Sequence, residues 1–258
     1  MRALTGEALL AAWEAAAQLP ELLRPLALLA AADPAGSAFL SALPLAKRDL
    51  NLVRLHTMSF SPDLAVFGTC PDCGERLEFA LPADEVAASL SAPADARPVE
   101  WIEDGRAFRL RPVTTDDLVA VAGVPDPDAA QDLLLALCLA GPGPEAQGRD
   151  TRGDVRPGDE EPGVEGPDPE VLSTEAPERF EELNADAEIQ CALDCPACGG
   201  HHVHDLDIAR FVWREVAVAA SRLLAEVHVL ASAYGWPERD ILRLTPHRRA
   251  AYVELVAG

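Results

Sequence analysis

The chain has 258 residues, of which 49% are hydrophobic, so it is long and apolar enough for one large or two small domains with a buried core. Its net charge of −22, from 43 acidic and 21 basic side chains, argues against general nucleic-acid binding and against anionic membrane surfaces. No apolar run reaches the ~18 residues that span a bilayer, and Glu7 and Glu14 interrupt the apolar N-terminus where a signal peptide would be apolar. We therefore expect a cytoplasmic protein with no membrane partner.

The N-terminal region 1–60 is predicted to be helical, because apolar residues recur there at helical spacing. Thr5 is a suitable N-cap for the first helix, and Pro20 opens the second. The predicted helices are two within residues 5–32 and one over 44–57.

The middle of the chain combines hairpins with short helices. Two strands flank a cysteine loop within 61–82, and Asp104-Gly105 is a strong turn signal for a second hairpin. Asp126 before Pro127 pairs an N-cap with a proline at the first helical position. The predicted elements are strands 64–69, 76–81, 99–102 and 107–111 and helices 114–122 and 127–140, of which those within 83–140 form an inserted subdomain.

Residues 141–172 differ from the rest in composition, with six Pro, seven Gly and nine acidic residues and no aromatic residue. Such a segment buries too little apolar surface to offset the entropy of ordering. We interpret it as a disordered acidic loop, a solvated linker rather than a tether for a basic partner.

The last part of the chain is predicted to be a knuckle followed by helices. Region 173–204 contains a helix near 174–183, a strand at 188–193 and a second cysteine loop. Region 205–258 is helical, with Asp205 or Asp207 as the first cap and Gly235 as the residue that ends the long helix. Shorter helices follow, the last of them opened by Thr245-Pro246.

The most informative motif is a repeated CPxCG loop, at residues 70–74 and 195–199. Two cysteines three residues apart can bind one edge of a metal tetrahedron if the chain turns tightly, which the proline and glycine favour. A pair of such loops predicts a structural Zn²⁺ site in a split zinc ribbon. The predicted ligands are Cys70, Cys73, Cys195 and Cys198.

Other uses of these cysteines are less consistent with the sequence. A redox CxxC motif would open a helix in a βαβ unit, whereas here two loops each end in glycine beside strand-like runs. Disulfides are rare in the cytoplasm. A catalytic zinc needs an open position, which four cysteines do not leave. Cys138 is interpreted as a core residue, Cys191 preferentially as a strand core residue, and His201, His202 and His204 preferentially as solvated. Cys191 and the three histidines stay open as substitute ligands.

No enzyme motif is found: the sequence contains no phosphate-binding loop, dinucleotide fingerprint, nucleophile elbow or HExxH. We therefore expect a protein that is not an enzyme and has no small-molecule substrate. Arginine and aromatic residues are interleaved in the C-terminal helices, which favours a protein-docking surface over a DNA reader in so acidic a chain. The predicted partner-binding residues are Tyr234, Trp236, Arg248, Arg249 and Tyr252.

Together these motifs resemble a known family, the baseplate-hub assembly chaperone-like proteins of T-even-type phages, whose relatives occur in gene clusters of contractile injection systems. The resemblance covers most of the chain except 141–172. It is carried by the CPxCG loops, by Phe108–Pro112 ahead of Asp116-Asp117-Leu118, by Asp205–Glu215 with its Phe-x-Trp-x-Glu pattern, by Glu226–Ala231, by Tyr234-Gly235-Trp236, by Asp240-Ile241-Leu242 and by Arg248-Arg249-x-x-Tyr252.

The resemblance implies a non-enzymatic factor that assists assembly of the baseplate or hub of a phage tail-like particle, or forms part of it. The implied partners are baseplate, hub or spike, and tape-measure proteins. The alternative is a zinc-ribbon regulator that binds nucleic acid through its C-terminal helices. In either case the expected fold class is α+β and mostly helical, with two knuckles on β-hairpins.

Overall fold

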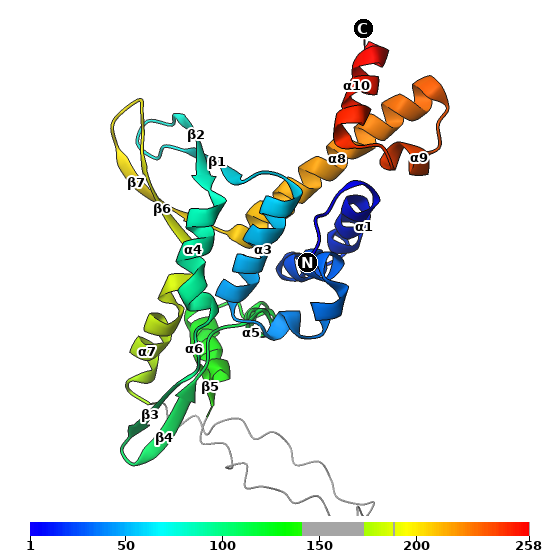
Figure 1. Ribbon diagram of the computed structural model, residues 1–258. Coiled ribbons are helices and arrows are strands. Elements are labelled where there is room, and N and C mark those ends of the chain that lie inside the picture. The colour runs from blue at the N-terminus through cyan, green and yellow to red at the C-terminus, as the bar shows by residue number, and fades with distance from the viewer. Residues whose placement is uncertain (141–172, 188, 258) are drawn as a thin grey trace, which may run out of the picture. The chain divides into compact units, whose positions relative to one another are not determined.

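The computed structural model describes residues 1–140, 173–187 and 189–257 (Figure 1). The segment predicted to be a disordered loop, 141–172, lies outside the described residues. The chain divides into two compact units, each described by itself: unit 1 comprises Met1–Asp95 and Asp186–Gly258, and unit 2 comprises Ala96–Ala185.

Unit 1 is a group of helices that carries two antiparallel β-hairpins (Figure 1). Its helices are α1 (Gly6–Ala17), α2 (Arg24–Ala32), α3 (Leu45–Ser59), α4 (Ala83–Ala94), α8 (Ile208–Tyr234), α9 (Glu238–Leu242) and α10 (Pro246–Ala257), with 3-10 turns at Glu21–Leu23 and Pro34–Ala42. Its hairpins are β1 (Asp63–Thr69) with β2 (Arg76–Pro82) and β6 (Ile189–Asp194) with β7 (His201–Leu206).

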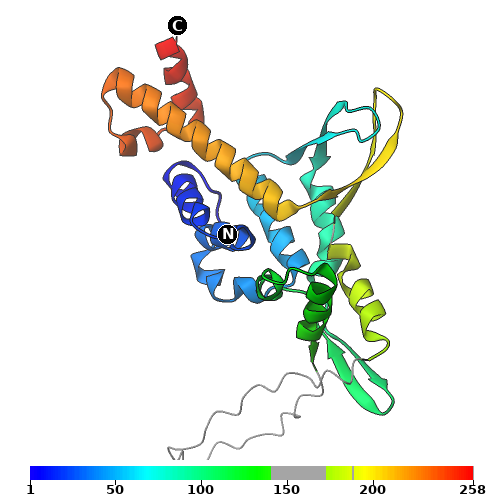
Figure 2. The same cartoon turned by 180° about the vertical axis from the view of Figure 1, so that it is seen from behind.

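The core of unit 1 lies between α3 and its neighbours. Helix α3 packs against α4 and α8, and α1 and α2 also contact α8, which runs beside them in Figure 2. Leu52 and Leu55 of α3 and Leu28 of α2 are fully buried. The same apolar cluster includes Leu64 at the start of the first hairpin, so the bases of the hairpins are fixed to the helices.

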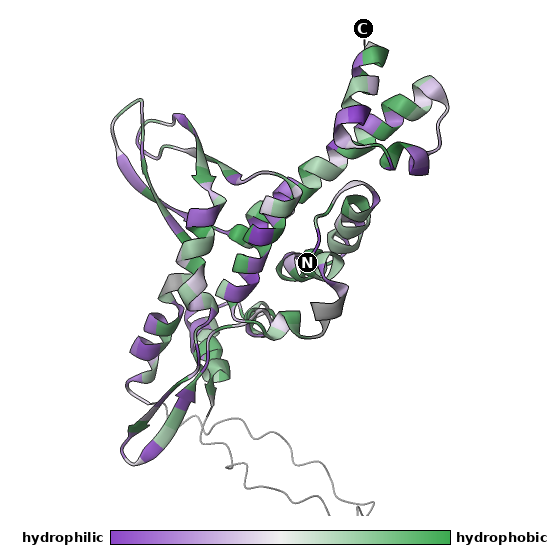
Figure 3. Cartoon of the chain, in the orientation of Figure 1, coloured by the Kyte–Doolittle hydropathy of each residue, from purple (hydrophilic) through white to green (hydrophobic). Residues whose placement is uncertain are grey.

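Helix α8 has clear stop and start signals. The Asp207 carboxylate accepts a hydrogen bond from the backbone N–H of Arg210 at 2.9 Å, and Gly235 ends the helix in the left-handed conformation at φ 66°. Hydrophobic and hydrophilic residues alternate in short stretches along it (Figure 3). Its buried residues recur at helical spacing: Ile208, Val212, Val216, Ala220, Leu223, Val227 and Leu230.

By length and composition alone, α8 is the one helix within the described ranges that could cross a membrane, with 27 residues and a mean hydropathy of 1.5 in its most apolar stretch. This finding amends the prediction that no segment is long and apolar enough. The buried stripe shows that α8 also serves as a core helix, an arrangement compatible with a soluble protein.

Helices α9 and α10 pack against the C-terminal half of α8. Val227 and Leu230 of α8 form a small buried cluster with Ile241 of α9, and Trp236 and Tyr252 pack against its edge. This cluster is distinct from the main core of unit 1.

In the part of unit 2 that the structure describes, a small antiparallel sheet is joined by three helices. The strands are β3 (Val99–Glu103), β4 (Arg106–Leu110) and β5 (Leu139–Ala140), in the order β3-β4-β5. The helices are α5 (Thr115–Val121), α6 (Pro127–Cys138) and α7 (Ala176–Asn184). The ring of Trp101 in β3 stacks on Phe108 of β4, and the Arg179 guanidinium of α7 lies 4.9 Å from the centre of the Trp101 ring.

The prediction of a mostly helical fold with small antiparallel hairpins is confirmed. Helix α4 was not predicted, although Val86 and Leu90 have the spacing of a buried helical stripe. Because α4 packs on α3, it belongs to unit 1, and the inserted unit therefore spans Ala96–Ala185 rather than the predicted 83–140.

Candidate metal centre

Two hairpins place the cysteine loops. In the first, β1 and β2 pair from Asp63↔Pro82 to Thr69↔Arg76, and in the second, β6 and β7 pair from Ile189↔Leu206 to Asp194↔His201. Each CPxCG loop is thus the connection at the far end of its hairpin.

Both loops have the same backbone hydrogen bonds. In the first loop the Cys70 N–H donates to the Glu75 carbonyl at 2.8 Å, and the Gly74 N–H donates to the Cys70 carbonyl at 2.9 Å. In the second loop the corresponding bonds are Cys195 N–H to the Gly200 carbonyl at 2.9 Å and Gly199 N–H to the Cys195 carbonyl at 2.8 Å. Gly74 and Gly199 have φ of 75° and 76°, which explains why glycine follows the second cysteine.

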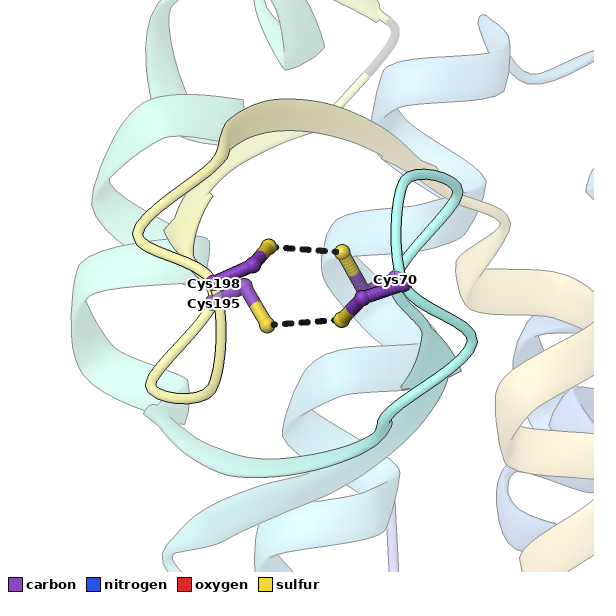
Figure 4. Close-up of side chains that lie close together, drawn as sticks. Cys70, Cys195 and Cys198 are labelled. Carbon is purple, nitrogen blue, oxygen red and sulfur yellow. Dashed lines mark hydrogen bonds between the residues drawn. The ribbon is translucent and has the colours of Figure 1, made fainter.

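The four cysteine sulfurs converge between the two hairpins (Figure 4). All lie within 4.8 Å of one another, with Cys70 and Cys198 sulfurs 3.7 Å apart and Cys73 and Cys195 sulfurs 3.6 Å apart. Bonds of about 2.3 Å in a tetrahedron would place the sulfurs about 3.8 Å apart, whereas disulfide sulfurs are about 2.05 Å apart. The spacing therefore fits a metal-binding cluster of free thiols.

The electrostatics of the cluster favour a bound cation. Backbone N–H groups of Cys198 and Ala197 lower the pKa of the Cys195 thiol to about 7. The Glu75 N–H lowers the pKa of Cys73, but burial and the neighbouring thiols outweigh it and raise that pKa to about 12. Because like charges repel, one ionised thiolate raises the pKa of its neighbours when no cation is bound. A bound positive ion would remove this repulsion and allow all four thiols to ionise.

The other candidate ligands have different surroundings. His201 is exposed and its Nδ1 lies 2.8 Å from an Asp194 oxygen. Cys191 is buried opposite His204 in the β6–β7 pairing, and burial raises the pKa of its thiol. Cys138 is buried in unit 2, as predicted for a core residue. Only His202 is placed beside the cluster among the described histidines and cysteines that were left open.

A second group was not anticipated from the sequence. The ligand atoms of Cys70, Asp72 and His202 also lie within 4.8 Å of one another. Asp72 is the one variable residue inside the first CPxCG loop, and no spacing rule indicates that it faces a histidine on the other hairpin.

The predicted partner-binding residues lie together at the end of α8 and on α10. The rings of Tyr234 and Trp236 stack with centres 4.7 Å apart, and the Tyr252 ring meets the Trp236 ring edge-on at 5.0 Å. Tyr234 is 40% exposed, and the exposed Arg248 guanidinium lies 5.8 Å from the centre of the Tyr252 ring.

Arg249 does not belong to this surface, contrary to the prediction. It is only 6% exposed, its Nε donates to the Glu226 carboxylate at 2.9 Å and its NH1 donates to the Leu244 carbonyl at 2.8 Å. Its role is to fasten α10 to α8. Glu226 lies 23 residues away in sequence, which is why the pairing is not readable from the Arg248-Arg249 dipeptide.

Comparison with protein-family models, with curated proteins and with solved structures found no match for this chain.

Proposed function

We propose that the chain binds one structural zinc ion through Cys70, Cys73, Cys195 and Cys198, and that it acts without catalysis as a protein-docking factor. The observation that supports zinc binding is the spacing of the four cysteine sulfurs. Soft thiolate ligands in a tetrahedron suit zinc or iron. All four positions are filled by protein, so no water can bind to the metal for hydrolysis.

Elemental analysis tests the metal directly. We expect one zinc ion per chain after purification without chelator, and four thiols that react only after the metal is removed. A stoichiometric iron content would contradict the choice of metal. A folded, metal-free protein with four freely titrating thiols would contradict the site itself.

The docking half of the proposal concerns the α8–α10 region. Aromatic and arginine side chains dominate binding energy at protein interfaces. Tyr234 and Arg248 are exposed in this region, and Leu255 of α10 is 72% exposed. The segments that resemble the baseplate-hub assembly proteins include α8, α9 and α10. We therefore propose baseplate, hub or spike, or tape-measure proteins of a contractile tail-like particle as the partners, and a role in their assembly.

A pull-down from cells that co-express a contractile tail-like gene cluster tests this role. The tagged chain should recover a baseplate, spike or tape-measure protein. The double variant Tyr234→Ala/Arg248→Ala should weaken that binding by at least ~10-fold, as truncation of interface hot spots does, while its zinc content is unchanged. Arg239→Ala, an exposed arginine on α9, is the matched control. Recovery of none of these proteins, or salt-sensitive recovery of DNA instead, would overturn the proposal.

A further inference from the structure

The two hairpins carry different side chains against the sulfurs in the strands that follow the loops. Seven residues after its first cysteine, the first hairpin has Leu77 in β2 and the second has His202 in β7. Leu77 is 6% exposed and packs against Cys70 and Cys195. An apolar side chain, Leu77, is thus enough to cover one side of the sulfur cluster. The polar His202 ring on the other side therefore requires a separate explanation.

The His202 ring connects the two hairpins. Its Nε2 lies 3.1 Å from an Asp72 carboxylate oxygen and 3.6 Å from the Cys70 sulfur, and both of these belong to the other loop. A lone pair on Nε2 would be repelled by the ionised carboxylate beside it, which favours the tautomer with the proton on Nε2. The same N–H is directed toward the Cys70 sulfur. A protonated Nε2 has no lone pair for a metal, so His202 is not a ligand in this arrangement.

Gly200 supplies the room for this contact. Its φ lies outside the left-handed region, so the backbone does not call for glycine there. A Cβ at Gly200 would be 2.6 Å from the Asp72 oxygen and 2.8 Å from His202 Nε2. The first loop has Glu75 at the equivalent position. Glycine in the second loop is therefore explained by space, and the space is taken up by the Asp72–His202 pair.

We propose that Asp72 and His202 form a clasp, a positioning pair that joins the two hairpins and donates an N–H to the Cys70 thiolate. The proposal rests on the metal site proposed above. Four thiolates around Zn²⁺ carry a net charge of −2, and an N–H directed at one sulfur offsets part of it. A carboxylate at ion-pair distance from the ring also favours one orientation of that N–H, as outer-shell partners do in other metal sites.

Zinc affinity measured by chelator competition tests the clasp on the full chain. His202→Leu copies the Leu77 arrangement and fills the same space without an N–H. We expect it to bind zinc about 10- to 100-fold more weakly, the usual cost of losing an outer-shell partner. His202→Gln, which retains an N–H donor, should recover part of the loss. The zinc affinity of Asp72→Asn should lie between that of His202→Leu and that of wild type. The control His201→Ala replaces the exposed neighbour of His202 and should bind zinc as tightly as wild type.

Cobalt substitution provides a readout that a purely structural role would not change. The thiolate-to-cobalt charge-transfer band should shift in His202→Leu and return toward the wild-type position in His202→Gln, with four thiolates bound in all variants. Unchanged affinity and an unchanged band in His202→Leu would overturn the clasp. Loss of one nitrogen ligand on that substitution would also overturn it, because His202 would then be a ligand. Failure of the wild-type chain to bind any metal would instead contradict the proposed zinc site.

Discussion

Replacement of Cys195 by serine should release the zinc ion and unfold the far ends of both hairpins. Cys195 is 2% exposed, and its sulfur lies 3.6 Å from that of Cys73 on the other hairpin, so the substitution removes one corner of the cluster. Structural zinc binds with an apparent free energy of ~10–16 kcal/mol in small zinc domains. Even a third of this free energy corresponds to roughly 10 °C in the unfolding temperature of a domain of this size, so release of the ion should lower that temperature by at least about this much.

The main helical core should survive this substitution, since Leu64 and the buried residues of α3 and α8 form a cluster separate from that of Cys70, Leu77 and Cys195. Thermal unfolding followed by circular dichroism, with zinc content measured in parallel, checks the expectation. Cys191→Ala, in β6 four residues before Cys195, is the matched control, and it should retain one zinc ion. Full zinc occupancy in Cys195→Ser would refute the assigned ligand set, and zinc loss in Cys191→Ala would indicate that Cys191 takes the place of one of the four ligands.

Replacement of Asp117 by alanine should destabilise unit 2 by about 2–3 kcal/mol. The buried Asp117 carboxylate accepts hydrogen bonds from Arg111 NH1 and NH2 at 2.6 and 2.7 Å and from the Thr114 backbone N–H and hydroxyl at 2.9 and 2.7 Å. Breaking a buried pair costs about 3–5 kcal/mol. A loss at or just below the lower end of this range is expected here, because the Arg111 side chain is 39% exposed and can bind water once the carboxylate is removed.

The same carboxylate gives this effect a defined pH dependence. Burial raises the pKa of Asp117, but hydrogen bonds from Arg111 and Thr114 outweigh burial and hold it below 3.8. A pKa lowered by folding contributes stability that is present above the unfolded-state value and lost as the pH falls through the folded value. The difference in stability between wild type and Asp117→Asn should therefore shrink below about pH 4.

Hydrogen exchange of unit 2 amides resolves this effect from changes elsewhere in the chain. Protection in α5 and β4 should fall in Asp117→Ala, with zinc content unaffected because the four cysteines all belong to unit 1. Asp116→Ala removes the exposed neighbouring carboxylate and should change stability by less than ~0.5 kcal/mol. Equal losses in the two variants would show that the Arg111 contact contributes nothing specific.

The parts of the molecule that can be predicted are those that depend on patterns of neighbouring residues in the sequence. The four cysteines were identified because each knuckle is a local turn whose proline, glycine and spacing follow from its own geometry. Helix α8 was predicted from its apolar period and from Asp207 and Gly235 at its ends. These signals need no knowledge of which distant residues meet.

The parts that were missed depend on distant contacts. The sequence predicts Arg249 as an exposed partner-binding residue, because it does not show that Glu226 lies beside this arginine. Asp72 and His202 are 130 positions apart in the sequence, so their contact cannot be predicted from local pattern. Only the approach of the two hairpins shows that the His202 ring faces Asp72 and Cys70. Pairs of this kind are set by tertiary packing, which local propensity does not report.

The separation of the two loops has a consequence during synthesis. Cys73 and Cys195 are 122 positions apart, and all of unit 2 is made between them. At about 5–20 residues per second, the first knuckle leaves the ribosome roughly 6 to 24 s before its partner. Throughout that interval the nascent chain presents two thiols of an incomplete site. Metal capture by all four ligands is therefore a late event, which follows the emergence of unit 2 rather than guiding it.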